Sequence, residues 1–462
     1  MNRAVRIIGK LLLAVAALPV LAYLVLIAIN WSDQPPSAAA LKFREIVAAR
    51  PAVPDADNAF VYMLGFSAPA DQDPKVAGAR RREWLENVVP VHFDQGDDPL
   101  ENSIALRDGG TPGLKQLGEV CRDSDPQACA EKFEALAHDW KPTVFDALAI
   151  ARYAQLLNLH AWREIVPLDV SAPLPGYADI LSGQRASMLS LRQIAESGDQ
   201  AAIGAFLNAD FALWRTVQRD SDSLIGKMIA IAGLRNHFFF SNLILRRLPA
   251  DRQLATAPAG WQTEFSRAER SLCRVMAGET LFVEQTMRGY KEGKETPYLV
   301  DDDLQIRGPV GRALLELGRP LFQLQHETNV IAGDYLSFAE AFDVPLNRYR
   351  VAADAYAKST QVKSTWHLYD LAGALIRMSD SGFPLTNYPF RVGSLEGMRR
   401  AALLTTQLRS RSVPAEKVAD ALRSAELTDP YTNAPFQWNV EHQTVMFSGP
   451  EDHRWHIQEY LY

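Results

Sequence analysis

The sequence contains few cysteines and no marked excess of charge of either sign. Only three cysteines occur in 462 residues, which excludes a disulfide-rich small protein and any zinc or iron–sulfur site built from four cysteines of this chain. Lysine and arginine number 48 against 55 aspartates and glutamates, a net charge of −7, so no basic excess indicates a nucleic-acid-binding protein. Phosphate-loop, dinucleotide-binding and Gly-x-Ser-x-Gly motifs are also absent. We therefore expect no nucleic-acid partner and no cofactor.

Long hydrophobic runs are scarce too, with one exception near the N-terminus. The run from Leu11 to Ile29 carries no charge, and its roughly 19 residues would cover about 28 Å as a helix, close to the thickness of a bilayer core. Basic residues precede the run and Trp31 follows it, so the positive-inside rule places the N-terminus in the cytoplasm. We expect a cytoplasmic tail over 1–10 and a transmembrane signal anchor over 11–31, in a bacterial inner membrane with the body in the periplasm.

Two other interpretations of this run remain open. A cleaved signal peptide normally has an apolar region of about 7–15 residues followed closely by small residues, whereas the small stretch Ala38–Ala40 lies beyond Pro35 and Pro36. A buried helix of a soluble protein is the third possibility. The length of the run favours the uncleaved anchor.

Cysteine spacing agrees with an exported body. Cys121 and Cys129 flank a segment in which Asp125 is suited to cap a helix and Pro126 to begin it. This geometry brings the two thiols together, and we predict a disulfide between them. Two unpaired thiols at a helix turn are the alternative, and Cys273 is interpreted as a small core residue.

Most of the remaining chain has helical periodicity, and no Ser/Gly-rich linker divides it. We predict a mainly α fold, a stacked and antiparallel multi-helical domain over 37–428. Its clearest part is three helices within 176–247, of which the third is apolar enough to be central. Longer helices are expected over 263–290 and 311–342, and loops over 90–112 and 384–389. No fixed repeat period is present.

The last part of the chain differs in kind. Residues 436–440 and 444–447 are short, aromatic and β-branched, and 455–461 alternate in polarity. This pattern predicts a small antiparallel β-sheet over 429–462 that caps the helical body.

Two stretches carry a resemblance to a known group of proteins. The run Asp429-Pro430-Tyr431-Thr432-Asn433-Ala434-Pro435-Phe436, with the two strands and Ser448-Gly449-Pro450 after it, resembles a C-terminal motif of uncharacterised bacterial membrane-anchored helical proteins. Ser223-Leu224-Ile225-Gly226 and the small apolar residues that follow are similar to a helical stretch of the same group. The resemblance implies an anchored helical protein and no particular chemistry.

The sequence indicates catalytic residues only weakly. A cell-wall or small-molecule hydrolase would need a carboxylic acid in an apolar pocket, and Glu279 and Glu164 are the glutamates whose neighbours favour this. Ordinary ion pairing at the edge of the core is the competing interpretation. Ser223 and Lys227 have the spacing of a Ser/Lys dyad, but helix capping explains Ser223.

Metal-binding residues are equally weakly indicated. His453, His456 and Glu459 have a spacing that would suit a metal on a helix, but the strand predicted there separates them, so we expect no metal. His326 and Glu327 lack the second histidine of a zinc-protease helix and are interpreted as a helix-surface pair.

These features favour a non-enzymatic envelope protein, anchored in the bilayer through Leu11–Ile29, that acts as a binding or scaffold module for an envelope partner. A hydrolase with a carboxylate in an inter-helix cleft is the first alternative. An apolar ligand carrier, with a pocket lined by Phe238, Phe239 and Phe240, is the second.

Overall fold

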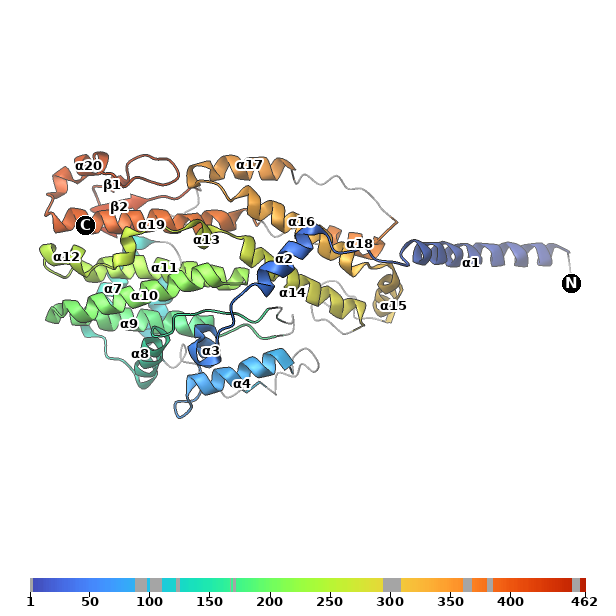
Figure 1. Cartoon of the computed structure of the whole chain (residues 1–462), viewed down its shortest axis with the longest axis horizontal. Helices are drawn as coiled ribbons and strands as arrows, with labels where there is room; N and C mark the ends of the chain where they lie inside the picture. Colours follow the sequence, from blue (N-terminus) through green and yellow to red (C-terminus); the bar gives the residue numbers. More distant parts are fainter. Residues whose placement is uncertain are drawn as a thin grey trace.

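The computed structural model describes residues 3–87, 98–99, 110–121, 125–166, 168, 172–293, 309–359, 368–379, 385–450 and 458–462. Over these residues the predicted fold class is confirmed: the chain is mainly helical and ends in a small antiparallel sheet (Figure 1). Most of the loop expected over 90–112 lies outside the described residues, as does the start of the strand expected from 455.

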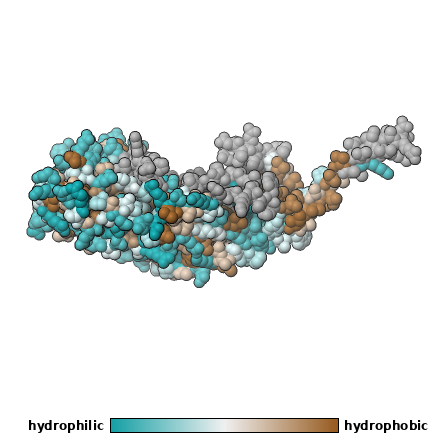
Figure 2. All heavy atoms as spheres, turned by 90° about the horizontal axis from the view of Figure 1, so that it is seen from above, coloured by the Kyte–Doolittle hydropathy of each residue, from teal (hydrophilic) through white to brown (hydrophobic). Residues whose placement is uncertain are grey.

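The N-terminal helix α1 (Arg3–Ile29) projects away from the body as a separate rod (Figure 1). Its apolar side chains Leu18, Leu21 and Leu24 are more than half exposed. Hydrophobic atoms gather around the place where this helix joins the body (Figure 2). Helices α15 (Pro309–Gly318) and α18 (Leu371–Ser379) lie near this place (Figure 1). Four exposed leucines of these helices and of the turn before α18 are called the apolar collar below: Leu314, Leu317, Leu368 and Leu375.

The C-terminal end of α1 is fixed to the body by hydrogen bonds rather than joined to it by a free linker. Asn30 is buried; its amide donates to the carbonyls of Leu26 and Leu368, and its side-chain oxygen accepts from the Asp370 amide at 2.6 Å. The Asp33 carboxylate then accepts hydrogen bonds from the Gln325 and His326 amides, in the first turn of α16 (Leu324–Ala341). The rod and the body therefore share one rigid junction.

The first helices of the body follow this junction. Ser37 caps α2 (Ala38–Ala48) as its sequence predicts, because its hydroxyl accepts the Ala40 amide. A single 3-10 turn, η1 (Asp55–Asp57), leads to α3 (Ala59–Leu64) and α4 (Pro74–Asn87), which lie side by side.

Three helices follow, and the predicted disulfide joins the first two of them. Helix α6 (Pro112–Val120) ends at Cys121, and α7 (Pro126–Asp139) begins at Pro126 with Asp125 as its cap. Cys121 and Cys129 are bonded, so this prediction is confirmed. Thr143 caps α8 (Val144–Leu156) with a capping box.

The centre of the body is formed by α9 (Tyr177–Ser197), α10 (Gln200–Asp220), α11 (Leu224–Leu245) and the later α19 (Asn387–Ser410). As predicted, α11 is central, and Leu234, Phe238 and Ile244 are fully buried. Among the described residues α11 is the one helix long and apolar enough to cross a membrane, but 67% of its apolar window is buried inside the body. This burial is typical of a core helix. A shorter apolar helical stretch is found at Ala17–Ile29.

The prediction of a single helix over 263–290 is wrong. After α12 (Ala250–Thr256) and η3 (Ala259–Gln262), the chain forms one short turn, α13 (Arg267–Arg270), and then α14 (Cys273–Lys291). Ser266 and Glu269 form a capping box around the short turn, and Ser271 is extended. The local hydrogen bonds of these serines therefore interrupt the helix.

The single helix expected over 311–342 is also wrong. Pro320 lies in a 3-10 turn, η6 (Arg319–Leu321), which separates α15 (Pro309–Gly318) from α16 (Leu324–Ala341) because proline donates no backbone hydrogen bond. The chain continues through η7 (Leu346–Arg348), α17 (Tyr349–Ser359) and α18 (Leu371–Ser379). The loop expected through 389 ends earlier, since α19 includes Pro389 in its first turn, where proline is tolerated.

The C-terminal sheet follows α20 (Ala415–Arg423) and has the order β1-β2-β3. Strand β1 (Gln437–Asn439) pairs antiparallel with β2 (Thr444–Phe447), and β2 with β3 (Gln458–Leu461). Val445, Phe447 and Tyr460 are buried against the helices, so the sheet packs on the body as predicted.

Candidate ligand-binding cleft

A cavity of about 680 Å³ opens between the first turns of α11 and α19, the middle of α14 and the chain that follows α8. This volume lies in the range of roughly 300–1,000 Å³ that is usual for small-molecule sites. Most of its lining is apolar, and both glutamates singled out from the sequence, Glu164 and Glu279, belong to it. The apolar part of the lining includes Phe60, Leu174, Ile225, Met228, Phe282 and Tyr388.

Glu164 is almost fully buried in the wall of this cavity, at 5% exposure. The indole of Trp162 donates to its carboxyl at 2.9 Å, and Ser223 and Ser221 also hydrogen-bond to it. Burial raises the pKa of Glu164 to about 7, although these hydrogen bonds act in the opposite direction. Near neutral pH the side chain is therefore divided between its acid and its carboxylate form.

Glu279 lies on α14 and faces the start of α11. Its carboxyl accepts the Leu224 amide at 2.6 Å, and so satisfies one of the free amides in the first turn of that helix. Burial raises the pKa of Glu279, while this hydrogen bond lowers it. The two glutamates, which are far apart in the sequence, thus meet at one helix N-terminus, where partial positive charge stabilises carboxylates.

Asp222 adds a third, fully buried carboxylate next to them. It forms ion pairs with Arg50 and with Arg274, whose Nε lies 2.8 Å from Oδ1. Arg50 also donates to the main-chain carbonyl of Glu164 at 3.2 Å. The negative charge of Asp222 is thus balanced by two arginines. Its proximity to Glu164 still raises the pKa of the Glu164 carboxyl.

Two glycines allow these groups to approach each other. A Cβ atom at Gly226 would lie 2.1 Å from Glu164 Oε1, and one at Gly278 would lie 1.8 Å from the Asp222 carbonyl oxygen. Both distances are far shorter than van der Waals contact. Larger residues at either position would therefore displace the acidic wall of the cleft.

The Ser/Lys pair does not form a dyad. Ser223 accepts the Gly226 amide at 3.0 Å as the cap of α11, which confirms the capping interpretation. Lys227 is buried and donates to the carbonyls of Gln218 and Glu269 at 2.8 and 3.0 Å. Burial lowers the pKa of Lys227 to about 7, but its ammonium is held by the main chain.

A second cavity of about 400 Å³ adjoins the first, since Met228 and Arg391 line both. It lies between α9, α11 and α19 and is closed by the end of α6. Its described lining contains Arg185, Arg235 and Arg391 and no aspartate or glutamate. Sequence reasoning missed these arginines, because their common orientation depends on the packing of three separate helices.

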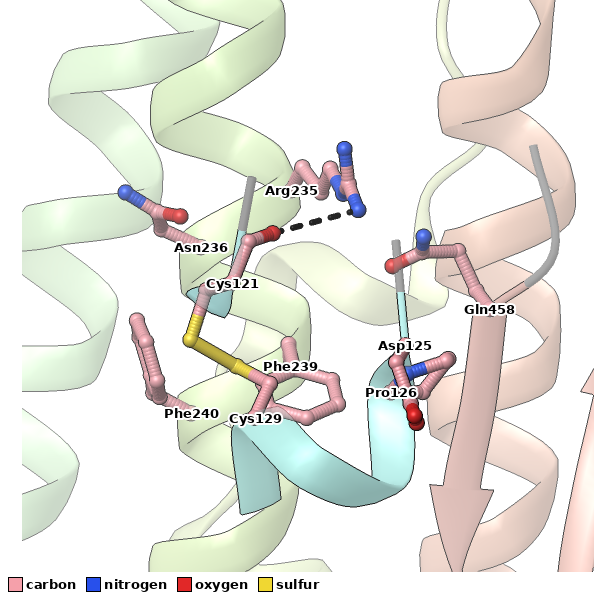
Figure 3. Close-up of a pocket in the computed structure, with 9 residues that line it drawn as sticks. All are labelled: Cys121, Asp125, Pro126, Cys129, Arg235, Asn236, Phe239, Phe240 and Gln458. Atoms are coloured by element: carbon pink, nitrogen blue, oxygen red, sulfur yellow. Dashed lines mark hydrogen bonds between the residues drawn. A yellow bond between two sulfur atoms is a disulfide. The ribbon is translucent and has the colours of Figure 1, made fainter. Parts of the chain in front are cut away.

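The disulfide borders a third and much smaller cavity, of about 20 Å³, beside Phe239 and Phe240 (Figure 3). This is room for about one water molecule. The phenylalanine run was considered as the lining of a ligand pocket, but Phe238 and Phe240 are 0% and 1% exposed and belong to the core. Among the described residues, the cavity beside this run is too small for such a ligand, so the apolar site considered there is not found.

The C-terminal metal candidates are only partly described. His453 and His456 lie outside the described residues. Glu459 lies on β3, where it accepts from Thr444 at 2.9 Å and lies 3.3 Å from the ring of His442. The predicted strand is present at Glu459, and its carboxyl has protein partners.

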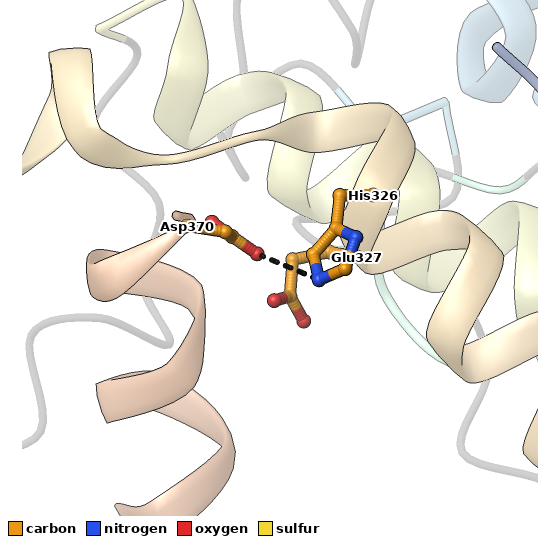
Figure 4. Close-up of side chains that lie close together, drawn as sticks. All are labelled: His326, Glu327 and Asp370. Atoms are coloured by element: carbon orange, nitrogen blue, oxygen red, sulfur yellow. Dashed lines mark ion pairs between the residues drawn. The ribbon is translucent and has the colours of Figure 1, made fainter. Parts of the chain in front are cut away.

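A different group of possible metal ligands, His326, Glu327 and Asp370, lies between α16 and α18 (Figure 4). Glu327 is 2% exposed, so its interpretation as a surface residue is wrong. Arg377 forms an ion pair with Glu327 and lies 3.8 Å from Asp370, whose pKa burial raises to about 6. Since Arg377 supplies the cation that this cluster needs, we assign it as an ion-pair cluster near the base of α1.

No protein-family model matches the chain, and neither curated proteins nor solved structures give a match. The resemblance noted at the C-terminal motif therefore stays a prediction.

Proposed function

We propose that this chain is a single-pass protein of the bacterial inner membrane whose periplasmic helical body is a binding module for an apolar or amphiphilic small molecule. The single observation that carries the proposal is the cavity of about 680 Å³ with its mainly apolar lining. This site replaces the phenylalanine pocket considered from the sequence. An envelope protein that delivers or receives the ligand is the expected partner.

The membrane part of the proposal is supported by α1 and by the apolar collar at its base. Apolar side chains of α1 face away from the protein, and the collar leucines Leu314 and Leu317 are 65% and 51% exposed. Trp31, which follows α1 in the chain, is 82% exposed, and tryptophan is favoured at the membrane–water interface. An exposed apolar surface of this kind is typical of contact with a membrane or a partner.

Topology is testable with two fusions. A C-terminal alkaline phosphatase fusion should be active in cells and a C-terminal green fluorescent protein fusion dark, because the first folds in the periplasm and the second in the cytoplasm. The mature chain should also retain residues 1–40 by intact mass. The proposed anchor would be contradicted if the green fluorescent protein fusion were fluorescent and the phosphatase fusion inactive. A mature chain starting near residue 30 or 40 would contradict it as well.

Ligand binding is tested on the full chain in amphipol with the neutral fluorescent probe N-phenyl-1-naphthylamine. We expect saturable binding that weakens at least tenfold in Ile225→Trp and Met228→Trp, since both side chains line the cavity. Leu254→Trp, at a 36% exposed position on α12, is the matched control. Loss of saturable binding in all proteins, or equal binding in all variants, would refute the proposal.

A hydrolase is the second candidate, and the presence of Glu164 and Glu279 in one cavity favours it. Glu164 combines burial with a pKa of about 7, which are the properties of a general acid, and Glu279 lines the same cavity. Purified peptidoglycan incubated with the protein should then release soluble fragments, with a roughly 10²–10⁴-fold loss in Glu164→Gln. No release by the unmodified chain would remove this candidate for that substrate.

A further inference from the structure

The two adjoining cavities have opposite chemistry. The larger is mainly apolar and contains Glu164 and Glu279, whereas the smaller contains three arginines and no described acidic side chain. We propose that together they bind an anionic amphiphile, with its hydrocarbon chain in the larger cavity and its carboxylate or phosphate among the arginines. This inference rests on the proposed function and names the class of its ligand.

The arginines come from three helices and surround one space. Arg185 lies on α9, Arg235 on α11 and Arg391 at the start of α19. Arg235 is half-buried, with its guanidinium 3.5 Å from the Cys121 carbonyl, and Arg391 packs over the ring of Tyr388 at 5.6 Å. Guanidinium groups match carboxylate and phosphate through paired hydrogen bonds. A cationic chamber of this kind therefore selects an anion.

The orientation of the ligand follows from charge. Arg391 and Met228 line both cavities, so the two cavities border each other at these side chains. An anionic group in the larger cavity would meet the two glutamates, which disfavour a like charge. The same group in the smaller cavity meets only cationic and neutral described side chains. The hydrocarbon chain then lies along the apolar wall formed by Ile225 and Phe282.

Three probes of equal chain length separate the contributions: labelled dodecanoate, dodecyl phosphate and dodecanol, bound to the full chain in amphipol. We expect at least one anion to bind ten times more tightly than dodecanol, which corresponds to about 1.4 kcal/mol. A stronger carboxylate arm indicates a fatty acid, and a stronger phosphate arm indicates a lipid phosphate.

Variants locate the anion. Arg391→Gln should weaken binding of the anionic probe much more than binding of dodecanol, so that most of the preference for the anion is lost. Arg391 is exposed, so its loss spares the core. Arg235→Gln should act in the same direction, with its melting temperature measured to verify folding. Arg252→Gln, at a 59% exposed side chain on α12, is the control.

Each result has one meaning. Equal affinity for all three probes, or an anion preference that survives in both arginine variants, overturns this inference while the apolar-ligand proposal stands. Failure of every probe, together with failure of the naphthylamine probe, overturns both. A preference that is lost in Arg391→Gln and kept in Arg252→Gln supports the inference.

Discussion

Replacing Glu164 by glutamine should change how the stability of the body depends on pH. Burial raises the pKa of Glu164 from 4.5 to about 7 in the folded chain. Below about pH 4.5 the folded and unfolded chains both hold the proton. Between 4.5 and about 7 only the folded chain holds it, so the free energy of unfolding falls as pH rises through this window and is level above it. Glutamine does not titrate, and its oxygen can still accept from Trp162.

The expected size follows from the two pKa values. At about 1.4 kcal/mol per pKa unit the full effect is about 3 kcal/mol, and roughly 2–3 kcal/mol of it falls between pH 5 and pH 8. A body of about 430 residues has an unfolding entropy of roughly 0.9 kcal/mol/K, so this corresponds to a melting-temperature difference of about 3 °C.

The assay is thermal unfolding of the full chain, followed by tryptophan fluorescence at pH 5, 6, 7 and 8. The melting temperature of Glu164→Gln minus that of the unmodified chain should increase by about 3 °C over this range. Glu83→Gln, an exposed position on α4, is the control and should show a constant difference. A constant difference for Glu164→Gln as well would refute the reasoning that burial holds the proton on this carboxyl.

Three further predictions concern the parts that hold the cleft and the anchor in place. Gly278→Ala should lower the free energy of unfolding by about 1–3 kcal/mol, because its Cβ would lie 1.8 Å from a carbonyl oxygen; Gly333→Ala, where the Cβ meets nothing within 4 Å, should be neutral or stabilising in the same thermal assay. Cys121→Ala should cost about 2.6 kcal/mol by loss of the bridge to Cys129, and iodoacetamide labelling under denaturing, non-reducing conditions should modify a single thiol in the unmodified chain. Asn30→Ala should cost about 1–3 kcal/mol by leaving buried groups without partners, and amide hydrogen exchange in α18 should accelerate; unchanged exchange would contradict a rigid junction.

Local signals in the sequence predicted much of the fold. The caps at Asp125 and Ser223 are formed as expected, because each cap is a hydrogen bond between neighbours in the chain. The two over-long helices had their own signals, which the apolar periodicity obscured: Pro320 in one, and the Ser266 capping box in the other. Both breaks could have been predicted by giving local chemistry more weight than periodicity.

The site was predictable only in part. Glu164 and Glu279 were selected for their apolar neighbours, and both lie on the cleft. Their meeting at the start of α11 depends on long-range packing, which no local pattern encodes. The same holds for Arg185, Arg235 and Arg391: surface arginines are common, and nothing in their spacing indicates one shared chamber.

Helix α14 links the cleft to the end of the body that carries α1. Glu279 and Phe282 line the cavity, while Met287 and Tyr290, further along the same helix, pack near Tyr23 and Leu26 of α1. From Glu279 to Tyr290 the helix rises only about 17 Å, so the cleft lies close to the base of the proposed anchor. A hydrocarbon chain leaving a bilayer would need to cross little water to reach it. If α1 is the proposed anchor, this proximity and the apolar lining favour the same class of ligand, and the junction at Asn30 would hold the cleft at a fixed height above the membrane.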